Sequence, residues 1–127
     1  MNTPKIATIA TLLMALAAPV MAEGDAKKGE KVFKKCKACH AVGEGAKNKV
    51  GPMLNGIVGA PAGQVPDFKY SSALMEAAEG GLIWDAENLG KFLTKPRDFM
   101  KGTKMSFAGL RKEKDVANII AYLETVE

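Results

Sequence analysis

The sequence predicts an all-α fold of short helices and irregular loops, and three observations point to this class. No stretch alternates apolar and polar residues for long, so β-strands are not expected. Apolar residues recur three and four positions apart in several short stretches, which is the pattern of one helical face. Glycine and proline interrupt residues 54–70 and leave no sustained period there, which predicts an irregular segment.

The first 22 residues resemble an export signal. Lys5 supplies the positive start, residues 6–18 form an apolar run, and Val20-Met21-Ala22 offers a cleavage site. The apolar run has thirteen residues, whereas a membrane-spanning helix needs about 20, so a cleaved signal is favoured over an anchor. With 127 residues the chain has room for one domain. We expect this domain to be residues 23–127, exported to the periplasm and not embedded in the membrane.

The charge balance is mildly basic. The chain has 18 lysines and arginines and 14 aspartates and glutamates; without Lys5 the balance is 17 to 14, a net charge of +3. No basic stretch is rich in aromatic residues, so nucleic-acid binding is not expected. A mild positive charge suits docking on acidic protein surfaces, because complementary charge speeds the encounter of the partners.

A first helix is expected from its N-cap, Asp25, to about Lys35 or Cys39, because a carboxylate at this position accepts from free backbone amides. Gly29 and Phe33 lie on its apolar face. A glycine within a helix costs on the order of 1 kcal/mol relative to alanine. Close approach by the backbone of another element would explain Gly29, and simple tolerance of the glycine is the alternative.

The segment Cys36-Lys37-Ala38-Cys39-His40 follows this helix. Its two thiols lie about one turn apart on one helical face, a spacing typical of covalent haem attachment, and the histidine would become an axial ligand of the iron. A disulfide between cysteines this close would close too short a loop to stabilise a fold. A thioredoxin-like pair needs a preceding strand, and a structural zinc site needs four ligands where the two cysteines and the single histidine give three.

Residues 41–51 predict a loop, and Gly51-Pro52 stands out after it. Pro52 can pack tightly against the ligand imidazole, and a neighbouring carbonyl can accept from the second ring nitrogen. A plain turn is the alternative for this proline. We expect residues 54–70 to wrap around a large apolar object, which a haem would supply.

Further helices are expected in the second half of the chain. Ser71 to Ala78 forms a short helix closed by Gly80-Gly81, where a left-handed cap is easy. The others run from Asp85 to Thr94, for one turn over residues 97–101, and from Glu113 to Thr125, where the buried stripe is Val116, Ile119, Ile120 and Leu123.

His40 is the only histidine, so a sixth ligand from this chain is a methionine or the position is open. Four methionines follow the signal: Met53, Met75, Met100 and Met105. Met75 is expected to be a core residue of its helix, and Met53 is expected on the same side of the haem ring as the histidine. Met105, in a loop with glycine and hydroxyl groups, is favoured over Met100, which stays open as an alternative.

These segments together resemble the class I c-type cytochromes, and within that family bacterial cytochrome c2 and mitochondrial cytochrome c. The resemblance implies a small cytochrome c fold of short helices and irregular loops around one covalently bound haem c. The matching pieces keep the family order: Gly24-Asp25, Lys28-Gly29, Phe33, Cys36 to His40, Val50-Gly51-Pro52 with Leu54 and Gly56, Phe68 to Ser71, Trp84-Asp85, Pro96 and Gly102 to Leu110.

The resemblance also implies roles for single residues. Met105 would be the sixth ligand, and Thr103 would support its loop. Tyr70 and Trp84 would hydrogen-bond the haem propionates, for which an aromatic ring with one donor is suited. Phe107 would lie at the exposed haem edge.

Three further comparisons follow from the resemblance. Gly29 and Phe33 would meet Tyr122 where the first and last helices cross. Phe92 stands where many relatives have a tyrosine that bonds the ligand sulfur, so one tuning interaction is expected to be missing. Ala60 replaces a common arginine near a propionate, which leaves that carboxylate less compensated.

With both axial positions filled by the chain, the iron has no place for a substrate, so we expect no enzyme. The resemblance implies a soluble, monomeric carrier of one electron from a cytochrome bc1 complex to a photosynthetic reaction centre or a terminal cytochrome oxidase. A small haem peroxidase or gas-binding haem protein with a labile sixth ligand is the alternative. Acidic partner surfaces would meet a basic rim, formed by Lys35, Lys37, Lys47, Lys49, Lys95, Arg97, Lys101 and Lys104.

Overall fold

The computed structural model describes residues 23–127, and the predicted export signal in residues 1–22 lies outside the described residues. The described chain is helical, and a single β-bridge joins Pro61 and Ile83. The predicted all-α class is therefore confirmed. The helices are α1 (Ala26–Phe33), α2 (Ser72–Glu79), α3 (Ala86–Thr94), α4 (Pro96–Phe99) and α5 (Glu113–Glu124).

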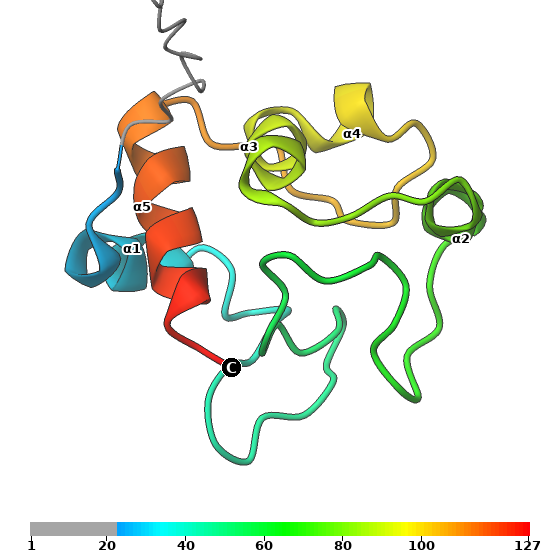
Figure 1. Cartoon of the computed structure of the whole chain (residues 1–127), viewed down its shortest axis with the longest axis horizontal. Coiled ribbons are helices and arrows are strands. Elements are labelled where there is room, and N and C mark those ends of the chain that lie inside the picture. The colour runs from blue at the N-terminus through cyan, green and yellow to red at the C-terminus, as the bar shows by residue number, and fades with distance from the viewer. Residues whose placement is uncertain (1–22) are drawn as a thin grey trace, which may run out of the picture.

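The helices surround the irregular middle of the chain (Figure 1). In that view α1 and α5 lie on the left, α3 and α4 at the top, and α2 on the right, while the loops of residues 41–70 run below. α5 packs against both α1 and α3, and α3 also contacts α4. None of the helices between residues 23 and 127 combines the length and the apolar character that a bilayer span requires.

The first helix is shorter than predicted. Asp25 is its N-cap and accepts from the Lys28 amide at 3.1 Å, as expected. The helix ends at Phe33, however, so an end at Lys35 or Cys39 was wrong. The chain tightens there into consecutive turns, in which Cys36 N–H donates to Phe33 O at 2.8 Å.

The crossing of α1 and α5 explains Gly29. A Cβ on this glycine would overlap the Asn118 carbonyl and lie 2.6 Å from Tyr122 Cβ. The rings of Phe33 and Tyr122 pack beside it with centroids 5.6 Å apart. The expected close backbone approach is confirmed, and simple tolerance of the glycine is excluded.

The core lies between α5, α3 and the segment before α3. The predicted stripe of α5 is buried, with Ile119 only 1% exposed. Leu89 and Phe92 of α3 are also buried. Trp84 is fixed just before α3, since its amide donates to Ala60 O at 2.8 Å and its carbonyl accepts from the Gly59 amide at 2.7 Å. The backbone thus ties the irregular segment to the core.

The caps of α2 and α3 agree with the sequence. Ser71 Oγ accepts from Leu74 N at 3.1 Å, and Asp85 Oδ1 accepts from Asn88 N at 2.8 Å. α2 ends at Glu79, and the left-handed residue after it is Gly81, with φ of 91°.

Met75 differs from the prediction, because its side chain is 42% exposed and is not a core residue. α2 has no fully buried residue, since it packs with one side only. Leu74, one position earlier, lies against the core cluster. Met75 is turned by about 100° around the helix axis and so lies toward solvent.

The helix crossing predicts the effect of Gly29→Ala. The added methyl group meets backbone that cannot move without separating α1 from α5, so we expect the free energy of unfolding to fall by about 3 kcal/mol. Denaturant unfolding of the haem-loaded protein measures this. Gly80→Ala is the matched control, because an added Cβ there has its nearest neighbour at 3.4 Å. Equal effects of the two substitutions would contradict the close crossing.

Candidate cofactor-attachment site

The two cysteines lie in the turns that follow α1. Cys36 and Cys39 are half-buried and form no disulfide. His40 N–H donates to Cys36 O at 2.9 Å, which holds the motif as a single turn. Burial raises the pKa of the Cys36 thiol, although Lys35 opposes the shift. The raised pKa favours the protonated, uncharged form of the Cys36 thiol.

The imidazole of His40 is fixed by Pro52. Its Nδ1 lies 2.6 Å from the Pro52 carbonyl oxygen. Because a carbonyl only accepts, Nδ1 carries the proton and Nε2 keeps a free lone pair. Burial lowers the pKa of His40, against the effect of the Pro52 hydrogen bond, and nearby Lys49 lowers it further. A neutral ring with Nε2 free is the form that binds a metal ion.

Gly51 packs directly against the same ring. A Cβ on Gly51 would overlap Cε1 of His40 and lie 2.8 Å from Nδ1. The Gly51 amide donates to Cys39 O at 2.8 Å, which returns the loop to the cysteine turn. Gly51 thus packs against the imidazole, and the Pro52 carbonyl accepts a hydrogen bond from its Nδ1.

Two asparagines that the sequence analysis missed hold this loop. Asn48 accepts from Met53 N at 3.0 Å and donates to Pro66 O at 2.9 Å. Asn55 bonds Gly43 through both atoms of its side-chain amide. An asparagine in a glycine-rich loop ordinarily indicates a local turn, so no local pattern predicts partners that lie this far away in the chain.

An apolar wall is built around Trp84, which is 5% exposed. Its ring lies 5.0 Å from that of Phe92 and 6.2 Å from that of Phe99, measured between centroids. Trp84 and Phe92 belong to the hydrophobic core, and Cys36, Met105 and Phe107 are partly buried against that core. A cysteine, the favoured methionine and two of the predicted aromatic residues therefore all belong to the core or pack against it.

The methionine segment has its own local support. Thr103 Oγ1 accepts from Met105 N at 3.3 Å, and Gly102 adopts a φ of 88°. Met105 is partly buried, whereas Met100 is a core residue with 6% exposure. Met100 thus already has an apolar role, which favours Met105 as the free thioether.

Tyr70 and Trp84 are held by different segments of the chain. Its hydroxyl oxygen accepts from Val65 N at 2.9 Å, and its ring meets Phe68 edge-on at 4.9 Å. The hydroxyl proton is not used in this bond and can be donated elsewhere. Burial raises the pKa of Tyr70, although the Val65 hydrogen bond opposes this.

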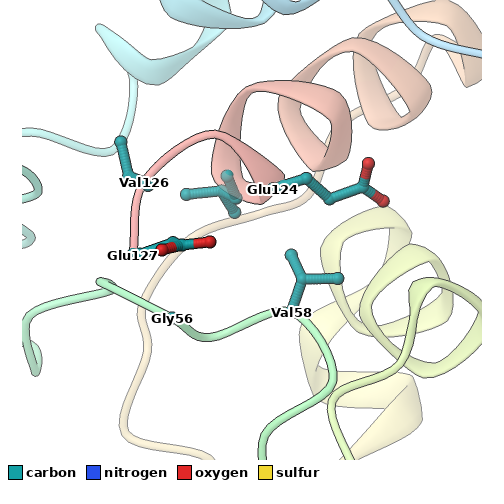
Figure 2. A pocket seen from close by; sticks show the side chains of 6 residues that line it. Gly56, Val58, Glu124, Val126 and Glu127 are labelled. Atoms are coloured by element: carbon teal, nitrogen blue, oxygen red, sulfur yellow. The ribbon is translucent and has the colours of Figure 1, made fainter.

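These residues fit a covalently attached haem. Two thiols one turn apart match its two attachment points, and the neutral imidazole offers Nε2 as a ligand. Gly51 lets the backbone lie against the ligand ring, and the Trp84 cluster supplies apolar surroundings. A separate hollow of about 380 Å³ lies at the end of α5 and contains no predicted site residue; it is lined by Gly56, Val58, Leu123, Glu124, Val126 and Glu127 (Figure 2).

Comparisons with known proteins agree with this site. The family model "Cytochrome c" matches residues 26–127. A cytochrome c2 of Agrobacterium tumefaciens is 54% identical over 101 residues, which are 80% of this chain and 91% of that protein. A cytochrome c2 of Rhodomicrobium vannielii is 46% identical over 125 residues, 98% of this chain and 97% of that protein. The solved structure of cytochrome cH from Methylobacterium extorquens superposes with a TM-score of 0.74 at 47% identity, over 80% of this chain and 99% of that chain.

The hydrogen bond of Tyr70 predicts a change in stability. Tyr70→Phe leaves the Val65 amide without its partner, so we expect the free energy of unfolding to fall by about 1 kcal/mol at pH 7. The raised pKa keeps the folded phenol protonated where the unfolded one, with a pKa near 10, already ionises. Its contribution is therefore complete below about pH 10 and is lost as the pH rises further.

The measurement is denaturant unfolding of both proteins between pH 8 and pH 11. Tyr122→Phe serves as the control, because it removes a hydroxyl and keeps the ring contact with Phe33. A difference between the native protein and Tyr70→Phe that stays constant over this pH range would contradict the buried, bonded phenol.

Proposed function

This chain belongs to the cytochrome c family and carries one covalently bound haem, and we propose that it works as a periplasmic one-electron carrier of the cytochrome c2 kind. The observation that carries the proposal is the fixed imidazole of His40, held by the Pro52 carbonyl at 2.6 Å and pressed by Gly51. A ligand ring that cannot turn keeps its geometry when the charge on the metal changes. Little reorganisation is what an electron carrier needs.

We propose these roles for the site residues. Cys36 and Cys39 would hold the haem through thioether bonds, and His40 and Met105 would be the residues that ligate its iron. The bound haem supplies a one-electron change at its iron. The Trp84 cluster excludes water from the site, and a neutral thioether with apolar surroundings disfavours extra positive charge.

The remaining residues position these groups. Pro52 orients His40, and Thr103 orients the Met105 loop through the Met105 amide. Tyr70 and Trp84 each bring a hydrogen-bond donor on an apolar ring, which suits a partly buried carboxylate such as a propionate. Phe107 covers the edge of the site. With two ligands from the chain, no coordination position is left for a substrate, so we propose no enzymatic activity.

A basic rim offers the docking surface. Lys49 Nζ donates to Lys37 O at 2.6 Å, which fixes one positive charge beside the cysteine turn. Val50, the next residue, is 80% exposed and adds an apolar spot among the lysines. All eight rim residues are exposed: Lys35, Lys37, Lys47, Lys49, Lys95, Arg97, Lys101 and Lys104.

Such a surface suits acidic faces of membrane redox complexes. We propose a cytochrome bc1 complex as the donor and a photosynthetic reaction centre or a terminal cytochrome oxidase as the acceptor, with a brief encounter through a small interface. We further propose that the chain is exported, is cleaved after Ala22 and acts as a monomer.

The sixth ligand is tested by two methionine substitutions. Met105→Ala removes the thioether from the iron, so we expect the reduced protein to bind carbon monoxide and the oxidised one to lose its sulfur-to-iron charge-transfer band. Met100→Leu keeps the core volume, costs less than about 1.5 kcal/mol and should leave both properties unchanged. Rapid carbon monoxide binding by the unsubstituted protein would instead support a gas-binding or peroxidase function.

The basic rim is tested by electron-transfer rates to an acidic redox partner at several salt concentrations. We expect the rate to fall as the ionic strength rises, because salt screens the attraction between exposed charges. Lys101→Glu combined with Lys104→Glu should slow the reaction at low salt by about tenfold. The control is Lys112→Glu with Lys114→Glu, which makes the same change of net charge outside the rim. Equal slowing by both pairs would exclude a localised docking surface.

A further inference from the structure

The side chain of Asn55 joins the segment that follows Pro52 to the segment that follows His40. Its Oδ1 accepts from Gly43 N at 3.1 Å, and its Nδ2 donates to Gly43 O at 2.9 Å. The amide therefore pairs with both backbone groups of one residue, as a neighbouring strand would. Gly43 lies three residues after His40, and Asn55 lies three residues after Pro52.

The second hydrogen of the same Nδ2 points to the segment that follows α5. It donates to the Glu127 carbonyl oxygen at 3.3 Å, and the next residue, Gly56, donates its amide to Val126 O at 2.8 Å. Figure 2 shows Gly56 on one side of the hollow, with Val126 and Glu127 facing it. The end of α5 is a firm support, since Leu123 is 4% exposed in the core.

The same two loop segments carry the ligand and its partner. Gly51 N donates to Cys39 O at 2.8 Å, and Leu54 N donates to Ala41 O at 3.0 Å. The His40–Pro52 hydrogen bond lies between these two contacts. Asn55 adds the last contact between these two segments, through its hydrogen bonds with Gly43. Glu127 then accepts from Asn55, and Val126 accepts from Gly56.

We infer that Asn55, backed by Val126 and Glu127, is a positioning residue for His40 because it holds the Pro52 carbonyl on Nδ1. The asparagine side chain supplies in one plane the acceptor and the two donor hydrogens that these three bonds use. The strength of the bond to Nδ1 sets the basicity of the ligand nitrogen. A looser bond makes His40 a weaker donor to the oxidised iron. The link to the reduction potential rests on the proposed electron-carrier function.

The test compares Asn55→Ala with Asn88→Ala in the haem-loaded protein. Asn88 also donates through its Nδ2 to one backbone carbonyl, that of Ile83 at 2.9 Å, but it belongs to α3. In the reduced state we expect the Gly51 and Leu54 amide protons of Asn55→Ala to exchange about tenfold faster, as the loss of one net hydrogen bond would give. The reduction potential should become more positive. Neither property should change in Asn88→Ala.

A second variant keeps the test informative if the alanine protein folds poorly. Asn55→Asp keeps the shape and the acceptor for Gly43 N–H but turns an oxygen toward the Gly43 and Glu127 carbonyls, so the same two amides should exchange faster. Asn88→Asp is its control for charge. The amide-exchange rates test the positioning contacts whether or not the protein carries electrons. The reduction potential tests the link between these contacts and the electron-carrier function. If exchange at Gly51 and Leu54 stays as in the native protein, or if it rises while the potential stays fixed, the inference is overturned.

Discussion

The structure depends on one hydrogen bond, from His40 Nδ1 to the carbonyl oxygen of Pro52. This bond decides which ring nitrogen is free, how the ring is turned and how strongly it can donate to a metal. Gly51 removes the remaining freedom, because its backbone lies where any side chain would meet the ring. These two contacts hold the only histidine of the chain in a single orientation with Nε2 free.

The helices support this hydrogen bond indirectly. α1 crosses α5 so closely that Gly29 has no room for a side chain, and this crossing fixes α1 and α5 relative to each other. The cysteine turn leaves from the end of α1, and the residues after α5 reach the loop through Asn55 and Gly56. A rigid helix pair therefore holds an irregular loop that has no regular structure of its own.

Apolar and charged side chains lie in different parts of the domain. The rings of Trp84, Phe92 and Phe99 pack together in and against the hydrophobic core, where an unpaired charge is costly. The lysines of the rim are all exposed, where a charge costs little and acts at long range. The same chain thus keeps its core apolar and its basic side chains at the surface.

Local patterns in the sequence determined the helices and their caps. Asp25, Ser71 and Asp85 cap helices as expected, because an N-cap acts on amides two or three residues away. The α5 stripe is equally local, since its buried residues follow from the helical repeat. The haem-attachment motif is contiguous, the loop around Met105 already favoured this methionine, and the resemblance to a family supplied the roles of Tyr70, Trp84, Thr103 and Phe107.

Only the tertiary structure decided where the loops find their partners. The end of α1 at Phe33 and the exposure of Met75 depend on what packs against each helix. Asn48 reaches Pro66, and Asn55 reaches Gly43 and Glu127, across 12 to 72 residues of sequence. Such contacts have no period and no fixed spacing, because they form between loops that meet only after the helices have packed.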